Sequence, residues 1–247
     1  MRKASHVILL ITAVVLADQA LKVYIKTHFY INESHEILGS WFRLHFVENE
    51  GMAYGWKLGG DGGKMLLTLF RLGAVIFGVY YLRSILKKKQ HPGFILCAAL
   101  IFAGALGNLI DSMFYGLIFE ESVPGSMAVA RIFPEQGYAG FLHGKVVDML
   151  YFPIISGYWP DWVPIVGGRY YQFFKPVFNI ADFAITLGVL NILFFQRSFL
   201  SSKIIHSEPE KDNENTEPEE EISSDLADSA AVDSLQPLEN PETPAGG

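Results

Sequence analysis

Four long apolar segments constrain the fold of this chain more than any other feature. They lie at Val7–Ile25, Met65–Leu86, Phe94–Leu117 and Val177–Phe195. Each is close to the length of roughly 20 residues that a helix needs to cross the hydrocarbon core of a bilayer. We therefore expect an all-α integral membrane fold with four transmembrane helices.

The distribution of Lys and Arg predicts how these helices are oriented. Basic residues crowd three short stretches: Arg2 and Lys3, Arg83 and Lys87–Lys89, and Arg197 and Lys203. Cytoplasmic loops carry an excess of Lys and Arg, and four crossings would put all three stretches on one side. We expect both termini in the cytoplasm and the long loops, about 26–64 and 118–176, on the outer side.

The first apolar segment has a second interpretation as a cleavable signal peptide. A basic start, the apolar stretch Val7–Leu16 and small residues near Ala17 fit that pattern. However, the segment continues through Asp18 and Lys22, which share a helix face and can pair. Its removal would also place the acidic tail and the Arg83–Lys89 cluster on opposite sides of the membrane. We expect the segment to be retained.

The outer loops predict a small β-sheet and an interfacial surface. Trp41–Val47 alternates in polarity as a strand does, so we expect a small sheet on the outer (periplasmic) face. The second outer loop is rich in aromatic residues, which favour the membrane interface. Anchoring at the interface and a lid over substrate are both compatible with that composition.

The last 41 residues differ in character from the rest of the chain. Residues 207–247 contain 13 acidic residues and one basic residue, Lys211, although the whole chain has a formal net charge of -7. Such a composition cannot bury enough apolar surface to fold. We expect a four-helix membrane domain at 1–206 and a disordered acidic tail at 207–247.

Cysteine content and motifs exclude several classes of protein. Cys97 is the single cysteine, so neither an intrachain disulfide nor a Cys-rich metal site can form. The sequence contains no phosphate-binding glycine loop and no nucleic-acid motif. We expect a monomer that contacts membrane lipid and binds neither nucleic acid nor a metal or other cofactor.

Polar residues in or beside the apolar segments are the candidate functional groups. They are Asp18, Asn108, Asp111, Asp148, Asn179 and Asp182. Ionisable groups are costly in a bilayer and face the protein interior or a wet cavity, so function is the first hypothesis. Asn108 and Asp111, like Asn179 and Asp182, are three residues apart and would share one helix face.

Asp148 and Asp182 are the candidate catalytic pair. We expect both near the outer boundary of the bilayer, with Asp182 two turns into the fourth helix. Two carboxyl groups held close together share a proton and titrate as a unit. One acid can then polarise a carbonyl while the other accepts a proton from water. The structural alternative is a hydrogen-bond network at a helix boundary.

The supporting residues also have structural interpretations. Asn108 and Asn179 could hold helices together without touching substrate. For Asp18 and Lys22 we favour a neutralised structural pair. Small residues would allow close helix packing, namely Gly104, Ala105, Gly107 and Ala181.

Five short elements in order resemble the lipoprotein signal peptidase (signal peptidase II) family. They are Asp18-Gln19-Ala20-Leu21-Lys22, Asn49-Glu50-Gly51-Met52-Ala53-Tyr54, Gly104-Ala105-Leu106-Gly107-Asn108-Leu109-Ile110-Asp111, Val146-Val147-Asp148 and Phe178-Asn179-Ile180-Ala181-Asp182. Each element alone is weakly specific, whereas five in order on the expected helices are specific. The resemblance covers the chain up to about Arg197.

The resemblance implies a membrane aspartic endopeptidase with Asp148 and Asp182 as its catalytic residues. The residues implied to bind substrate or support the site are Asn49, Gly51, Asn108, Asp111, Asn179, Ala181, Asp18 and Lys22, and Gly104 would keep the substrate path open. The implied substrate is a diacylglyceryl-modified prolipoprotein, cut before its lipidated cysteine at the bacterial inner membrane. The resemblance also implies no metal and inhibition by globomycin.

Three features depart from the family pattern. The family carries Arg after the acid of the third-helix element, where this chain has Ser112. The charge of Arg131, Lys145 or Arg169 makes each a candidate replacement. The stretches between Asp111 and Asp148 and between Asp148 and Asp182 are longer than usual, and the acidic tail is additional.

Other functions remain compatible with parts of the sequence. A transporter or proton channel would place acids at mid-membrane depth, with a path to both faces. A non-catalytic scaffold would tolerate Asp148→Asn and Asp182→Asn. A presenilin-like intramembrane protease is disfavoured because the chain has no G-x-G-D element.

Overall fold

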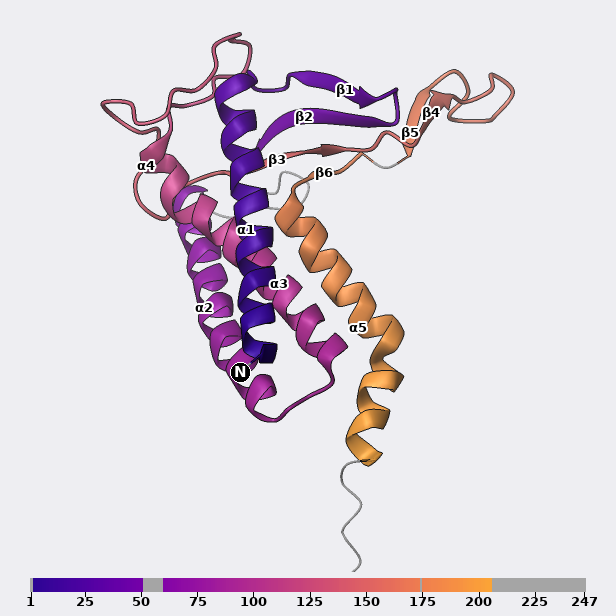
Figure 1. Cartoon of the computed structure of the whole chain (residues 1–247). Coiled ribbons are helices and arrows are strands. Elements are labelled where there is room, and N and C mark those ends of the chain that lie inside the picture. Colours follow the sequence, from indigo (N-terminus) through magenta and orange to yellow (C-terminus); the bar gives the residue numbers. More distant parts are fainter. Residues whose placement is uncertain (1, 51–59, 174, 206–247) are drawn as a thin grey trace, which may run out of the picture. The chain divides into compact units, whose positions relative to one another are not determined.

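A computed structural model describes residues 2–50, 60–173 and 175–205 of the chain. The helices are α1 Arg2–His28, α2 Gly60–Lys87, α3 Pro92–Ile110, the π-helical turn η2 Asp111–Tyr115, α4 Gly116–Ile118 and α5 Ile180–Ile205. The strands are β1 Ser34–Leu38, β2 Phe42–Asn49, β3 Val146–Tyr151, β4 Ile155–Tyr158, β5 Tyr170–Phe173 and β6 Val177–Phe178. The prediction of apolar helices with a small sheet is therefore confirmed (Figure 1).

Within the described residues, three helical stretches are long and apolar enough to cross a membrane. They are Ala4–His28, Gly62–Lys87 and Pro92–Ile118. The apolar part of α5, Ile180–Phe195, is shorter. Membrane crossing is thus supported for the first three predicted spans, while the fourth crossing remains a prediction.

Helix α3 packs against α1, α2 and α5, and small residues bring α3 and α5 close together. A Cβ atom added to Gly104 would lie 2.2 Å from the backbone oxygen of Ala181. Further along the same contact, a Cβ on Gly188 would lie 2.7 Å from the backbone oxygen of Cys97. The two backbones therefore approach too closely for larger side chains at these positions.

A four-stranded antiparallel sheet lies at the end of the bundle where α1 ends and α5 begins (Figure 1). Its strand order is β1-β2-β3-β6, and Val47 of β2 is the register partner of Asp148 in β3. The expected strand Trp41–Val47 corresponds to β2. Strands β4 and β5 form a separate two-stranded sheet. The central sheet thus places Asp148 beside the helix ends.

The start of α5 differs from the prediction. We expected a helix from Val177, but Val177 and Phe178 pair with Tyr151 and Leu150 as strand β6, and α5 begins at Ile180. The Oδ1 atom of Asn179 accepts the backbone N–H of Asp182 at 2.9 Å, as an N-cap residue does. Asp182 therefore lies in the first turn of α5, not two turns into the helix.

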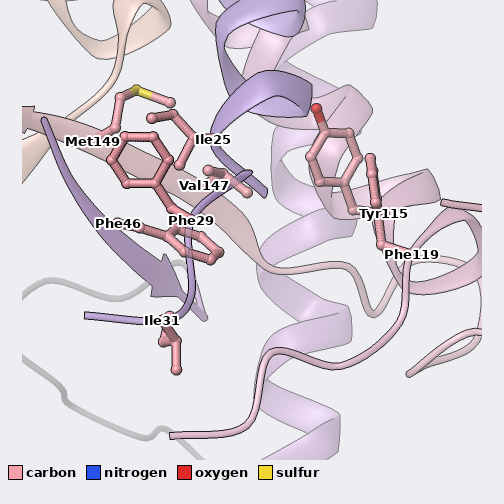
Figure 2. Close-up of a cluster of buried hydrophobic side chains, with 8 residues drawn as sticks. All are labelled: Ile25, Phe29, Ile31, Phe46, Tyr115, Phe119, Val147 and Met149. Atoms are coloured by element: carbon pink, nitrogen blue, oxygen red, sulfur yellow. The ribbon is translucent and has the colours of Figure 1, made fainter. Parts of the chain in front are cut away.

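A buried apolar cluster fixes the sheet against the helices. Figure 2 shows its members, Ile25, Phe29, Ile31, Phe46, Tyr115, Phe119, Val147 and Met149. Val147 and Met149 are fully buried and flank Asp148 in β3. Burying such side chains contributes about 1.5–3 kcal/mol each. This packing holds the strand that carries Asp148 in one register.

Candidate active site

Asp148 is a buried carboxyl group held by two side-chain amides. Its side chain sits in β3 and is 3% exposed. The Nδ2 atom of Asn179 donates to Asp148 Oδ1 at 2.7 Å, and Asn49 Nδ2 donates to Asp148 Oδ2 at 3.1 Å. Both carboxyl oxygens of Asp148 therefore have a fixed hydrogen-bond donor.

Asp182 lies across Asn179 from Asp148. The Asn179 side chain donates to Asp148 from Nδ2 and accepts the Asp182 backbone N–H at Oδ1. The carboxyl group of Asp182 is half-buried, and its Oδ1 accepts a hydrogen bond from Asn108 Nδ2 at 2.7 Å. One amide therefore joins the strand that carries one acid to the helix that carries the other.

The environment of Asp148 favours its protonated form. The pKa of Asp148 is raised to about 7, mainly by burial and then by the negative charge of Asp182. Hydrogen bonds from Asn49 and Asn179 act in the opposite direction, because they stabilise the carboxylate. A carboxyl group that titrates near neutral pH beside a second acid can hold or release a proton, as acid–base chemistry on water requires.

A buried charge cluster centred on Lys22 is linked to this pair through Asn108. Lys22 Nζ lies 2.7 Å from Asp18 Oδ2 and 2.8 Å from Asp111 Oδ2, and it donates to Asn108 Oδ1 at 2.9 Å. Lys22, Asp18 and Asp111 are each at most 1% exposed. The same Asn108 side chain donates to Asp182, so the Lys22 cluster orients a residue that contacts the acid pair.

The two acids of the cluster also bind the backbone of the elements that carry the pair. Asp18 Oδ1 accepts the N–H of Ala181 at 2.9 Å, in the first turn of α5, where the helix dipole favours a negative charge. Asp111 Oδ2 accepts the N–H of Val147 at 3.4 Å in β3. The cluster therefore holds the backbone next to Asp182 and next to Asp148, which is a structural role.

Gln19 is a part of this cluster that sequence reasoning did not single out. Its Nε2 donates to Asp111 Oδ1 at 2.8 Å, and its Oε1 accepts from the Tyr115 hydroxyl at 3.2 Å. Its place directly after Asp18 in the first family element was the available signal.

Arg71 of α2 is the second residue that sequence reasoning missed. Its Nη1 atom donates to Ser112 Oγ at 2.7 Å. The three candidates proposed by charge lie elsewhere: Arg131 pairs with Glu120, Lys145 with Glu48 and Glu121, and Arg169 is exposed next to β5. A lone Arg within an apolar helix was the signal that pointed to it.

The remaining predicted residues divide into two groups. Gly104 and Ala181 lie at the close contact between α3 and α5, and a Cβ on Gly107 would lie 2.8 Å from Asp18 Oδ2. Gly51 falls outside the described residues. Among the residues that the structure describes, no group of three His, Cys, Asp or Glu side chains is placed to hold a metal ion.

Comparisons with known proteins identify related sequences over most of the chain. A family model described as Signal peptidase (SPase) II matches residues 10–198. A lipoprotein signal peptidase of Porphyromonas gingivalis is 44% identical over 186 residues, which cover 74% of this chain and 79% of the relative. One of Amoebophilus asiaticus is 35% identical over 193 residues, 77% of each chain.

Solved structures share the fold. A bacterial membrane enzyme determined by the in meso method at 1.9 Å resolution is 28% identical, with a TM-score of 0.50. The match covers 77% of this chain and 91% of that chain. A second such enzyme, at 2.3 Å resolution, is 24% identical with a TM-score of 0.51, over 83% of this chain and 94% of that chain.

Proposed function

The chain belongs to the signal peptidase II family and removes signal peptides from prolipoproteins, and we propose that it does so as an aspartic peptidase with Asp148 and Asp182 as its catalytic pair. The observation that carries this proposal is the Asn179 side chain, which bonds Asp148 through Nδ2 and the Asp182 backbone through Oδ1. A buried acid with a pKa of about 7 beside a second acid supports the same assignment.

In the proposed reaction the pair begins with one proton, on Asp148. Asp182 accepts a proton from water, whose oxygen attacks the scissile carbonyl carbon while Asp148 protonates the carbonyl oxygen. The resulting tetrahedral diol collapses when Asp182 gives its proton to the leaving nitrogen and Asp148 recovers its own. The C–N bond breaks, a carboxylic acid and an amine form, and the pair returns to its starting state.

We assign the substrate as a diacylglyceryl-modified prolipoprotein cut before its lipidated cysteine. Exposed apolar side chains adjoin the site in sequence, with Phe183 next to Asp182 and Phe70 next to Arg71. These exposed aromatic rings support access of the substrate to the acids from the bilayer, because apolar rings can contact lipid chains. A lipid anchor confined to the membrane would present the peptide bond to the acids without diffusion in three dimensions.

The proposed orientation is that of a monomeric enzyme of the bacterial inner membrane with α5 as a fourth crossing. Both termini would be cytoplasmic, and the sheet and the acid pair would face the periplasm. Support comes from the basic link between α2 and α3, which lies at the opposite end of the helices from the sheet (Figure 1).

Cleavage of a diacylglyceryl-modified prolipoprotein by purified protein in detergent tests the proposal. We expect globomycin-sensitive release of the signal peptide, lost in Asp148→Asn and in Asp182→Asn. Asp161→Asn is the matched control, because Asp161 is an exposed acid between β4 and β5. Cleavage by both site variants at the control rate would refute the catalytic pair. A folded wild-type protein without cleavage would favour the transporter or scaffold alternatives.

A further inference from the structure

Arg71 is a half-buried cation in an otherwise apolar stretch of α2. It is held by Ser112, which is 1% exposed in the π-helical turn that follows α3. A charged side chain in such a helix is costly unless it has a partner or a function. Arg71 forms no ion pair within the described ranges, so the neutral Ser112 hydroxyl is a weak explanation for its presence.

Ser112 connects Arg71 to the catalytic pair through a short chain of hydrogen bonds. The Ser112 hydroxyl accepts from Arg71 and donates to the backbone oxygen of Asn108 at 2.8 Å. The side chain of Asn108 then donates to Asp182 at 2.7 Å. Because the hydroxyl both accepts and donates, it links the guanidinium of Arg71 to Asn108, the residue that contacts Asp182.

The guanidinium has donors left for a ligand. A guanidinium carries several N–H donors in a planar fork, and one of its nitrogens is engaged by Ser112. Asp182, Asp111 and Asp148 are the carboxyl groups that act electrostatically on Arg71. Each has another hydrogen-bond donor: Asn108 for Asp182, Lys22 and Gln19 for Asp111, and Asn49 and Asn179 for Asp148.

We propose that Arg71, anchored by Ser112, binds a backbone carbonyl oxygen of the substrate peptide beside the scissile bond. This inference rests on the proposed catalytic pair. A neutral acceptor suits the position better than an anion, because four acids, Asp18, Asp111, Asp148 and Asp182, surround two cations, Lys22 and Arg71. The excess of acids repels a second negative charge, whereas a carbonyl oxygen adds none.

The same inference accounts for the serine that departs from the family pattern. At position 112, where the resemblance leads one to expect Arg, this chain has a small side chain that receives a guanidinium from α2. A bulky side chain at this buried position would displace Arg71. In this chain the positive charge therefore comes from Arg71 of α2, and it lies beside position 112, where the family carries its Arg.

The test compares Arg71→Gln, Arg71→Lys and the exchange Arg71→Ser with Ser112→Arg in the cleavage assay. Arg83→Gln is the matched control, since it removes an exposed Arg from the same helix. We expect Arg71→Gln to lower kcat/KM by about ten- to a hundredfold, the effect of losing a charge-assisted hydrogen bond. Arg71→Lys should keep the positive charge but lose the planar fork of N–H donors. The double variant that exchanges Arg71 and Ser112 should recover part of the cleavage activity.

A pH profile separates this role from a merely structural one. Removing a cation near the pair makes its proton harder to lose, so the descending limb of kcat/KM should move to higher pH in Arg71→Gln. If Arg71→Gln had the same kcat/KM and the same descending pH limb as Arg83→Gln, the inference would be overturned. If Arg71→Gln does not fold, Ser112→Ala decides instead, with a several-fold rise in KM expected and an unchanged KM contradicting it.

Failure of this inference is distinguishable from failure of the proposed function. An active Arg71→Gln with an inactive Asp182→Asn would remove only the role of Arg71. An active Asp182→Asn would remove the catalytic pair and this inference with it.

Discussion

The side-chain amide of Asn179 donates from Nδ2 to Oδ1 of Asp148 at 2.7 Å, and it does so from the N-cap position of α5. The cap and the acid contact use opposite ends of one amide. The residue that caps the helix carrying Asp182 is therefore also a hydrogen-bond donor to Asp148 in the neighbouring strand.

The first prediction concerns pH. Because the pKa of Asp148 is raised to about 7, its proton is present below that pH and is lost as the pH rises through it. We expect kcat/KM to fall over the same interval. Asn49→Ala removes a hydrogen bond that lowers the pKa of Asp148, so its descending limb should move to higher pH. Asn191→Ala, an amide on α5 bonded to Leu187, is the control. A limb at the wild-type position in Asn49→Ala would contradict the assignment.

The second prediction concerns the buried cation. Lys22→Met leaves Asp18 and Asp111 without the ammonium group that both contact. Breaking a buried ion pair on one side costs about 3–5 kcal/mol, so we expect a large drop in the melting temperature in detergent. Lys88→Met, at an exposed position, should melt like the wild type. Adding Asp111→Asn to Lys22→Met should recover part of the loss, and no difference between Lys22→Met and Lys88→Met would refute a supporting role.

The third prediction concerns helix packing at the site. Gly104→Ala would place a Cβ 2.2 Å from the backbone oxygen of Ala181, so α3 and α5 would have to separate. Since Asn108 and Asp182 lie on these two helices, we expect lower kcat together with a lower melting temperature. Gly73→Ala is the matched control, because a Cβ there meets nothing within 4 Å. Equal activity in both variants would show that the close contact is dispensable.

The fourth prediction concerns the acidic tail. Deleting residues 207–247 should leave turnover of the lipidated substrate unchanged, because the proposed site draws its residues from α1, α2, α3, η2, α5 and the sheet. Steady-state cleavage by the truncated and the full chain provides the comparison. A large loss of turnover in the truncated protein would show that the tail takes part in catalysis or substrate capture.

Much of the fold could be predicted, because the length of each apolar segment and the spacing of residues within it indicate a helix directly. The spacing of Asp18 and Lys22 predicted their ion pair, which the structure contains. The contacts of Lys22 with Asp111 and Asn108 cross between helices and have no signature in either segment alone. Sequence patterns therefore located the participants but not their partners.

Two features could not be read from local patterns. The residues Val177 and Phe178 continue the apolar run of α5, and only their pairing with β3 makes them a strand and Asn179 a cap. Arg71 and Ser112 are 41 residues apart in sequence, so their contact depends on how α2 packs against the end of α3. In both cases tertiary contacts override a local preference.

Single-turnover cleavage by Asp148→Asn, Asp182→Asn and the double variant tests the central claim most directly. Residues that act as one unit lose the same activity singly and together, so we predict three equally low rates, while globomycin-sensitive cleavage persists in the wild type. A single variant that cleaves at a rate close to the wild type, or a double variant slower by the product of the two single losses, would contradict the account.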